Sequence, residues 1–124
     1  MGTLREIVFD CEGPARLARF WAGLLDGYAV RAYDEAEIDR LAGLGLTPET
    51  DPTVMVDGPG PSLCFQLVPS RRYDNNRVHL DIGVANVAAA VVAAVGAGAE
   101  LVREEAQYSV LRDPEGNQFC LVRR

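Results

Sequence analysis

The feature that most constrains the fold is an internal repeat. "REIVFDCEGPARLARF" and "RVHLDIGVANVAAAVV" both read as a strand, a turn and a helix, with a spacing of 73 residues that sets Glu6 against His79. "CFQLVPS" and "QFCLVRR" match at a spacing of 54, which sets Gln66 against Cys120. Because the ends of both segments match in the same order, the chain is predicted to contain two copies of one structural unit.

Each copy carries the signals of one helix. Pro14 stands where a first helical residue needs no bonded N–H, and Gly27 can take the left-handed conformation that stops the helix. The apolar stripe between them consists of Leu17, Phe20, Trp21, Leu24 and Leu25. The second helix is predicted to start at the N-cap Asn86 and to end at Gly96 and Gly98. Its inner face is expected to carry Val87, Val91 and Val95.

Three short strand candidates follow each helix, separated by the turns "DGPGP" and "DPEGN". They cover residues 28–33, 53–57 and 62–68, and then 100–105, 108–113 and 118–123. The first copy is longer by the 19 residues 34–52, an acidic and partly helical excursion. The order is therefore β-α-β-β-β twice, which predicts an α+β fold. We expect one domain over residues 1–124, with module one at about 4–69 and module two at about 76–124.

Composition narrows the classes of function. The net charge of −6 argues against a protein that grips the phosphate backbone of nucleic acids. The sequence has no run of about 20 apolar residues, so no membrane span is expected, and its start lacks the apolar stretch of a signal peptide. Cys11, Cys64 and Cys120 are odd in number and widely spaced, a pattern typical of reduced thiols in the cytoplasm.

Alternation along the strands places the polar candidates on one side. In the strand at 78–84, Val78, Leu80 and Ile82 need the core, which turns His79 and Asp81 to the opposite face. On four predicted strands, the same pattern places a set of side chains on the face opposite the core: Glu6, Asp10, Gln66, His79, Asp81 and Cys120. If a pseudo-twofold axis relates the copies, Glu6, Gln66, His79 and Cys120 converge on one point.

These segments resemble the vicinal oxygen chelate superfamily, in particular its glyoxalase-like branch with bleomycin-resistance relatives. The resemblance is carried by "GPARLARFW", by "NRVHLDIGV" followed by "ANVAAAV", and above all by "DPEGNQFCL". It covers essentially the whole chain. It implies the glyoxalase/bleomycin resistance/dioxygenase fold, in which paired modules form a cupped, barrel-like mixed sheet around a small-molecule cavity. It also implies a homodimer.

The resemblance also implies positions for a divalent metal ion, namely Glu6, Gln66, His79 and Cys120. The first position is often His in metal-using members and the last is usually Glu, so only His79 is the expected residue. Zinc is the most compatible ion, because carboxylate, imidazole and thiolate all bind it, whereas Cys120 argues against manganese, iron or magnesium. Cys120 also fits as a small apolar filler. The mixed donor set leads us to expect no tightly held metal.

Two functions from different classes remain open. The first is a small-molecule-binding protein, in which Asp10, Gln66 and Asp81 line the cavity and His79 contacts the ligand. The alternative is a metal-dependent lyase or isomerase acting on a small vicinal-oxygen substrate, with His79 and Glu6 as catalytic residues that move a proton. The incomplete ligand set favours binding. We expect His79 to point into the cavity and to stay buried beside Asp81, and we assign Asp113 and Asn117 to a structural turn.

The first prediction concerns oligomeric state. The family resemblance and the short strand edges left by each module predict a homodimer. Light scattering on the purified protein at micromolar concentration should give twice the chain mass. A clean monomer mass would contradict it.

Overall fold

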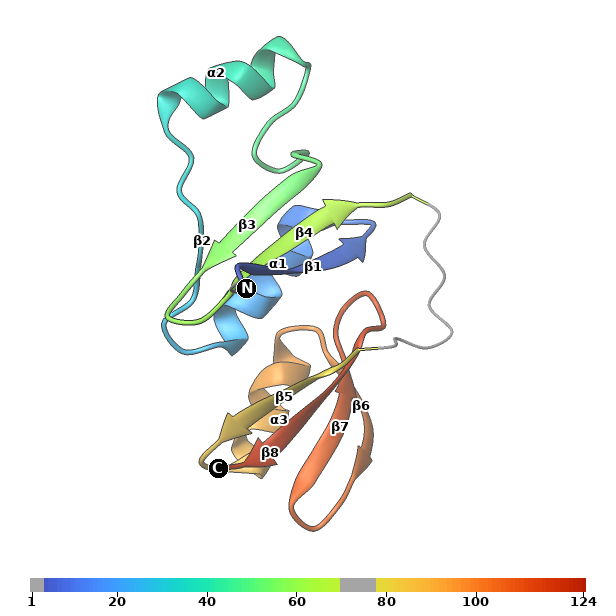
Figure 1. Ribbon diagram of the computed structural model, residues 1–124. Coiled ribbons are helices and arrows are strands. Elements are labelled where there is room, and N and C mark those ends of the chain that lie inside the picture. Colours follow the sequence, from blue (N-terminus) through green and yellow to red (C-terminus); the bar gives the residue numbers. More distant parts are fainter. Residues whose placement is uncertain (1–3, 70–77) are drawn as a thin grey trace. The chain divides into compact units, whose positions relative to one another are not determined.

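The structure is a computed structural model that describes residues 4–69 and 78–124. The chain divides into two compact units, one up to residue 71 and one from residue 72. Each unit contains one copy of the predicted β-α-β-β-β order, and unit 1 has an additional helix (Figure 1). The α+β prediction with two tandem modules is therefore confirmed. Residues 76 and 77, which the prediction included in module two, lie outside the described residues.

Unit 1 is a four-stranded mixed sheet covered on one face by a helix. Its elements are β1 (Glu6–Cys11), α1 (Pro14–Leu24), β2 (Ala29–Val30), α2 (Glu35–Gly43), β3 (Thr53–Asp57) and β4 (Ser62–Leu67). The strand order is β1-β4-β3-β2, with β1 parallel to β4 and the other pairs antiparallel. Helix α1 packs on β3 and β4. The parallel pair requires a crossover, which α1 begins.

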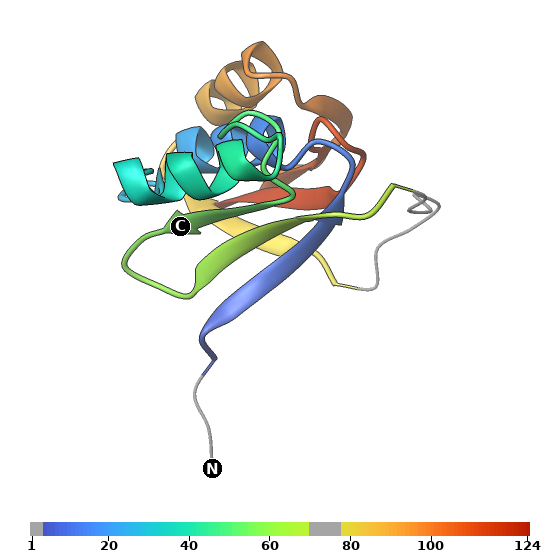
Figure 2. The same cartoon turned by 90° about the horizontal axis from the view of Figure 1, so that it is seen from above.

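Unit 2 repeats this topology. Its elements are β5 (Leu80–Val84), α3 (Val87–Gly96), β6 (Glu100–Glu104), β7 (Tyr108–Arg112) and β8 (Gln118–Arg123). The order is β5-β8-β7-β6, again with a parallel first pair. Helix α3 lies along one face of this sheet (Figure 2). Among the described residues the eight strands form two separate sheets of four rather than one continuous barrel.

The excursion contains the predicted helix, but it shortens the strand that precedes it. A strand was predicted over residues 28–33, and β2 is only Ala29–Val30. The backbone still donates once more to β3, from Arg31 N to Met55 O at 2.9 Å, and then leaves the sheet. Asp34 caps α2 by accepting from the Glu37 N–H at 2.8 Å. The cap starts a helix where the sequence favours one, so the strand cannot continue.

The core of unit 1 is an aromatic cluster between α1 and the sheet. Trp21 is 1 % exposed and its ring centroid lies 5.4 Å from that of Phe9 and 5.7 Å from that of Phe20. Phe9 in turn stacks on Phe65 at 4.9 Å. The predicted stripe on α1 is thus the buried face, and Gly27 has the positive φ of 76° that its place after the helix requires.

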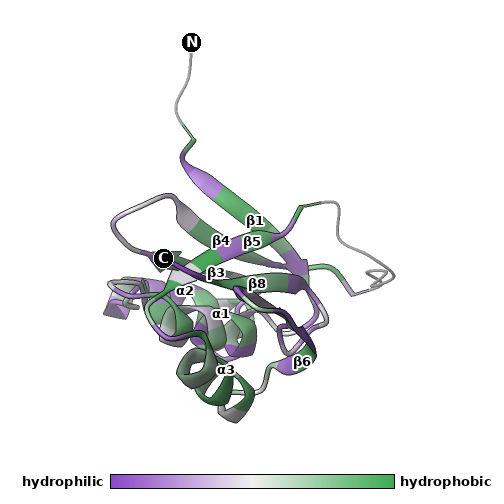
Figure 3. Cartoon of the chain, turned by 90° about the horizontal axis from the view of Figure 1, so that it is seen from below, coloured by the Kyte–Doolittle hydropathy of each residue, from purple (hydrophilic) through white to green (hydrophobic). Residues whose placement is uncertain are grey.

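Helix α3 is apolar along nearly its whole length (Figure 3), yet it buries few side chains. Asn86 caps it as predicted, accepting from the Ala89 N–H at 2.9 Å. The inner face is formed by Val91 and Ala94, whereas Val95, predicted to face inward, is 45 % exposed. Val95 lies about 100° around the helix from Ala94, which turns it away from the sheet. No helix in the described ranges is both long and apolar enough to cross a membrane.

The second prediction tests the aromatic cluster. Replacing Trp21 with Ala removes a buried ring that contacts two others, so the free energy of unfolding should fall by about 3–5 kcal/mol. Urea unfolding followed by circular dichroism measures this change. Val92→Ala, at a side chain 75 % exposed on α3, is the control and should change stability by less than about 0.5 kcal/mol. A Trp21→Ala variant of unchanged stability that no longer binds ligand would make Trp21 a binding residue instead.

Candidate functional site

The strands of both units turn their polar side chains away from the helices, as alternation predicted. Along β1, Glu6, Val8 and Asp10 are exposed while Cys11 is fully buried. Along β5, Asp81 is exposed between the half-buried Leu80 and Ile82. Each unit therefore has one apolar face under its helix and one polar face, and the predicted site residues belong to the polar faces.

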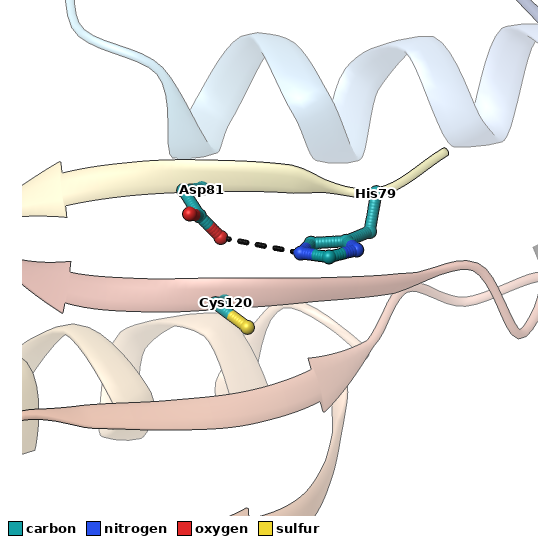
Figure 4. A group of neighbouring side chains, drawn as sticks. All are labelled: His79, Asp81 and Cys120. Carbon is teal, nitrogen blue, oxygen red and sulfur yellow. Dashed lines mark ion pairs between the residues drawn. The ribbon is translucent and has the colours of Figure 1, made fainter. Parts of the chain in front are cut away.

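Three predicted residues come together on the polar face of unit 2. The Nε2 atom of His79 lies 3.5 Å from Oδ1 of Asp81, two residues further along the same strand direction. Asp81 is paired in register with Cys120 on the neighbouring strand β8. Figure 4 shows the imidazole and the carboxylate facing each other, with the thiol on the adjacent strand. One donor atom from each of the three side chains lies within 4.8 Å of the others.

These side chains belong to a larger hollow of about 420 Å³ on the same sheet. Its polar lining includes three residues that were not predicted, namely Arg103, Tyr108 and Gln118. Apolar side chains complete it: Val110, Phe119 and Val122. Alternation could have found Gln118, because it lies two residues before Cys120 in β8. Arg103 follows a register shift in β6 that alternation could not have foreseen.

His79 is more exposed than expected. Its side chain is 57 % exposed and that of Asp81 is 65 % exposed, so the prediction of a buried histidine is wrong for this structure. The reason is the position of His79 directly before β5, beyond the first paired residue Leu80. The partnership with Asp81 that was predicted for the imidazole is present. An exposed imidazole with a carboxylate partner can hydrogen-bond a ligand at this surface.

The Cys120 thiol is held in its protonated form. Burial raises its pKa, and the nearby Asp81 carboxylate raises it further by its charge and by a hydrogen bond, while Arg103 opposes the shift. A thiolate beside a carboxylate is electrostatically unfavourable, which is why the neutral thiol is preferred. Cys120 is consequently a weak nucleophile at neutral pH.

Glu6 and Gln66 lie at different places on the polar face of unit 1. Glu6 is paired in register with Ser62, whereas Gln66 is paired with Asp10, four residues or roughly 13 Å further along β1. Glu6 lies near Cys64: burial raises the pKa of that thiol, and the charge of Glu6 raises it further. Unit 1 therefore brings Gln66 and Asp10 together but not Gln66 and Glu6.

The strand registers also revise the alignment of the repeat. In unit 2 the residue paired with Cys120 is Asp81, and in unit 1 the residue paired with Gln66 is Asp10. When the last strands are matched, Asp10 corresponds to Asp81 and Val8 to His79, so Glu6 lies two residues further from the pairing point. Convergence of Glu6 and Gln66 with His79 and Cys120 stays a prediction.

The turn between β7 and β8 has the structural role assigned to it. Asp113 is buried and accepts hydrogen bonds from the backbone N–H groups of Glu115 and Asn117, both at 2.9 Å. Its second oxygen accepts from the Asn117 side-chain amide at 2.8 Å. This network fixes the chain just before β8 and thereby sets the position of Cys120.

All three cysteines are free thiols in the structure. Cys11 and Cys64 are buried and Cys120 is partly exposed. Among the described residues, the unit-2 site is where a thiol, an imidazole and a carboxylate lie close enough together to bind one metal ion.

A protein of two β-α-β-β-β units with a polar hollow on a mixed sheet has the architecture of the vicinal oxygen chelate proteins. Residues 6–122 match the glyoxalase-like domain family, and the chain belongs to it. No curated protein matches the sequence. The predicted resemblance is thus confirmed at the level of the family.

Solved structures agree on the fold. A glyoxalase/bleomycin resistance protein/dioxygenase family enzyme from Burkholderia phytofirmans matches with a TM-score of 0.70 at 16 % identity, over 97 % of both chains. The trypanothione-dependent glyoxalase I of Leishmania major matches with 0.64 at 18 % identity, over 99 % of this chain and 87 % of that one. A bleomycin-binding protein in complex with bleomycin matches with 0.56 at 11 % identity, over 100 % and 99 %.

The third prediction tests the environment of Cys120. Because the Asp81 carboxylate raises the pKa of this thiol, Asp81→Asn should lower that pKa and increase the thiolate fraction at neutral pH. Alkylation of Cys120 by iodoacetamide, followed by mass spectrometry of its peptide, should then become severalfold faster. Asp26→Asn makes the same charge change at an exposed position and should leave the rate unaltered. Equal rates of Cys120 alkylation in the two variants would show that Asp81 does not influence the pKa of this thiol.

Proposed function

We propose that the protein is a small-molecule-binding protein of the vicinal oxygen chelate type, whose ligand is held on the polar face of the β5-β8-β7-β6 sheet. The observation that carries this proposal is the hollow of about 420 Å³, which is lined by apolar side chains together with a few polar ones. That combination is the usual make-up of a site for a small organic molecule.

The side chains at this hollow suit hydrogen bonding more than chemistry. His79 and Asp81 form a donor and acceptor pair at the surface, and Arg103 and Tyr108 add further donors. Cys120 stays protonated and so contributes a small, weakly polar surface rather than a nucleophile. We also propose that Asp10, Gln66 and Glu6, on the polar face of unit 1, are ligand-binding residues. We further propose a homodimer in the cytoplasm, the location that three free thiols favour.

The second candidate is a zinc-dependent lyase or isomerase of the glyoxalase type. It is favoured by one observation, the approach of His79, Asp81 and Cys120 donor atoms to within 4.8 Å of one another. Imidazole, carboxylate and thiolate are all zinc ligands, and three protein ligands with an open position are typical of catalytic zinc. Bound zinc would polarise a substrate oxygen. His79 would then be a ligand, which leaves Glu6 as the candidate for moving a proton.

The fourth prediction separates the two candidates. His79→Ala removes a polar group that lines the hollow, so binding of a small organic ligand, selected by screening against the wild type and measured by isothermal titration calorimetry, should weaken by about tenfold. The melting temperature and the metal content should remain nearly unchanged. Gln107→Ala, on the exposed turn before β7, is the matched control and should bind as the wild type does.

Elemental analysis of protein purified without chelator decides the alternative. A stoichiometric zinc ion that is lost in His79→Ala would favour the lyase over the binding protein. If neither binding of the screened ligand nor metal content responds to His79→Ala, the unit-2 hollow is not the functional site.

A further inference from the structure

Unit 1 contains a second hollow, built by the excursion that has no counterpart in unit 2. Helix α2 stands apart from the sheet and is joined to it by one segment from β2 and one returning to β3 (Figure 1). The hollow has a volume of about 290 Å³, near the lower end of the roughly 300–1,000 Å³ found for small-molecule sites. Its apolar walls are Leu41, Leu44, Leu46 and Met55.

A buried carboxylate lines this hollow. Asp51 is 7 % exposed, and its Oδ2 atom accepts from the Tyr33 hydroxyl at 2.7 Å while Oδ1 accepts from the Thr53 N–H at 3.0 Å. Both donors are neutral. A carboxylate has about four acceptor positions, so two hydrogen bonds do not saturate it. Burying a charge without a cationic partner is costly, which makes the site receptive to a cation.

The other charges around the hollow are already paired. The Arg31 guanidinium donates to both oxygens of Asp57, at 2.7 and 2.9 Å. The Arg40 guanidinium is close enough to interact with the charge of Asp51, but it donates to Glu37 at 2.9 and 3.1 Å. Each arginine is thus balanced by its own carboxylate, and the negative charge of Asp51 is left over.

Tyr33 keeps its proton and therefore remains a donor to Asp51. Burial raises the pKa of the Tyr33 hydroxyl, and the hydrogen bond to Asp51 raises it further. The carboxylate is consequently fixed in place by two donors that flank the excursion, Tyr33 and Thr53, before any ligand arrives. Such fixed geometry lowers the entropy cost of binding.

We propose that the hollow between α2 and β3 binds a small organic cation. Its ammonium group interacts with Asp51, and its apolar body lies against Leu44, Leu46 and Met55. This site is lined by residues of unit 1 alone and adds a second ligand class to the protein. The sequence signal for it is the position of Asp51 near the end of the acidic excursion, two residues before β3.

Hexylamine, protonated at neutral pH, is the probe. In an NMR titration the backbone amide of Thr53, which donates to Asp51, should shift saturably with hexylamine and should not shift with hexanoate. Asp51→Asn keeps the size and one acceptor oxygen but removes the charge, so hexylamine binding should weaken by about tenfold or more. Glu49→Gln makes the same charge change at a side chain 66 % exposed, outside the hollow, and should bind as the wild type does.

A second variant keeps the test decisive if Asp51→Asn fails to fold. Leu44 is 65 % exposed, so Leu44→Arg should fold, and its cationic side chain should occupy the hollow and abolish hexylamine binding. The proposal is overturned if hexylamine gives no saturable shift or if hexanoate binds equally well. It is also overturned if Asp51→Asn folds and binds hexylamine like the wild type. If Asp51→Asn does not fold, the same result for Leu44→Arg overturns the proposal.

Discussion

The parallel pairing of the first and last strand of each unit is the constraint on which the rest of the structure depends. β1 pairs with β4 and β5 pairs with β8, and a parallel pair requires the intervening chain to cross over. The helix that begins this crossover covers one face of the sheet in each unit. Once that face is closed, the large apolar residues alternate toward the helix, and the side chains between them, including Glu6, Asp10, Asp81 and Cys120, take the other face. The candidate site is a consequence of this sorting.

Much of the fold follows from sequence because the signals are local. Pro14 and Asn86 mark helix starts, and the β3 and β8 ranges 53–57 and 118–123 match the predicted strands. The sequence-based predictions were wrong where contacts between distant parts of the chain determine the local structure. β2 is cut short because Asp34 caps α2, and Val95 faces outward because the sheet meets α3 at Val91 and Ala94. A short uniform helix of Val and Ala does not itself specify which face packs.

The site was predictable in its residue types but not in its register. Period-two alternation tells which face His79, Asp81 and Cys120 take, and the structure brings these three together. It does not tell how far one strand slides along the next. Asp10 precedes the α1 cap Gly13 by three residues, whereas Asp81 precedes the α3 cap Asn86 by five. This difference of two preserves the face, so Glu6 was assigned to the correct side but aligned with the wrong neighbour.

The balance between ligand binding and metal binding in unit 2 depends on whether the Cys120 thiol keeps its proton. A zinc site made from His79, Asp81 and Cys120 requires the thiolate, so the ion must displace a proton that burial and Asp81 hold in place. The raised pKa therefore weakens zinc binding at neutral pH, and affinity should grow as pH rises toward that pKa. A carboxylate at position 120 would carry no such cost. Hydrogen bonding of an organic ligand by His79 needs no proton to leave Cys120. At neutral pH the raised pKa of the thiol therefore weakens zinc binding but leaves ligand binding unaffected.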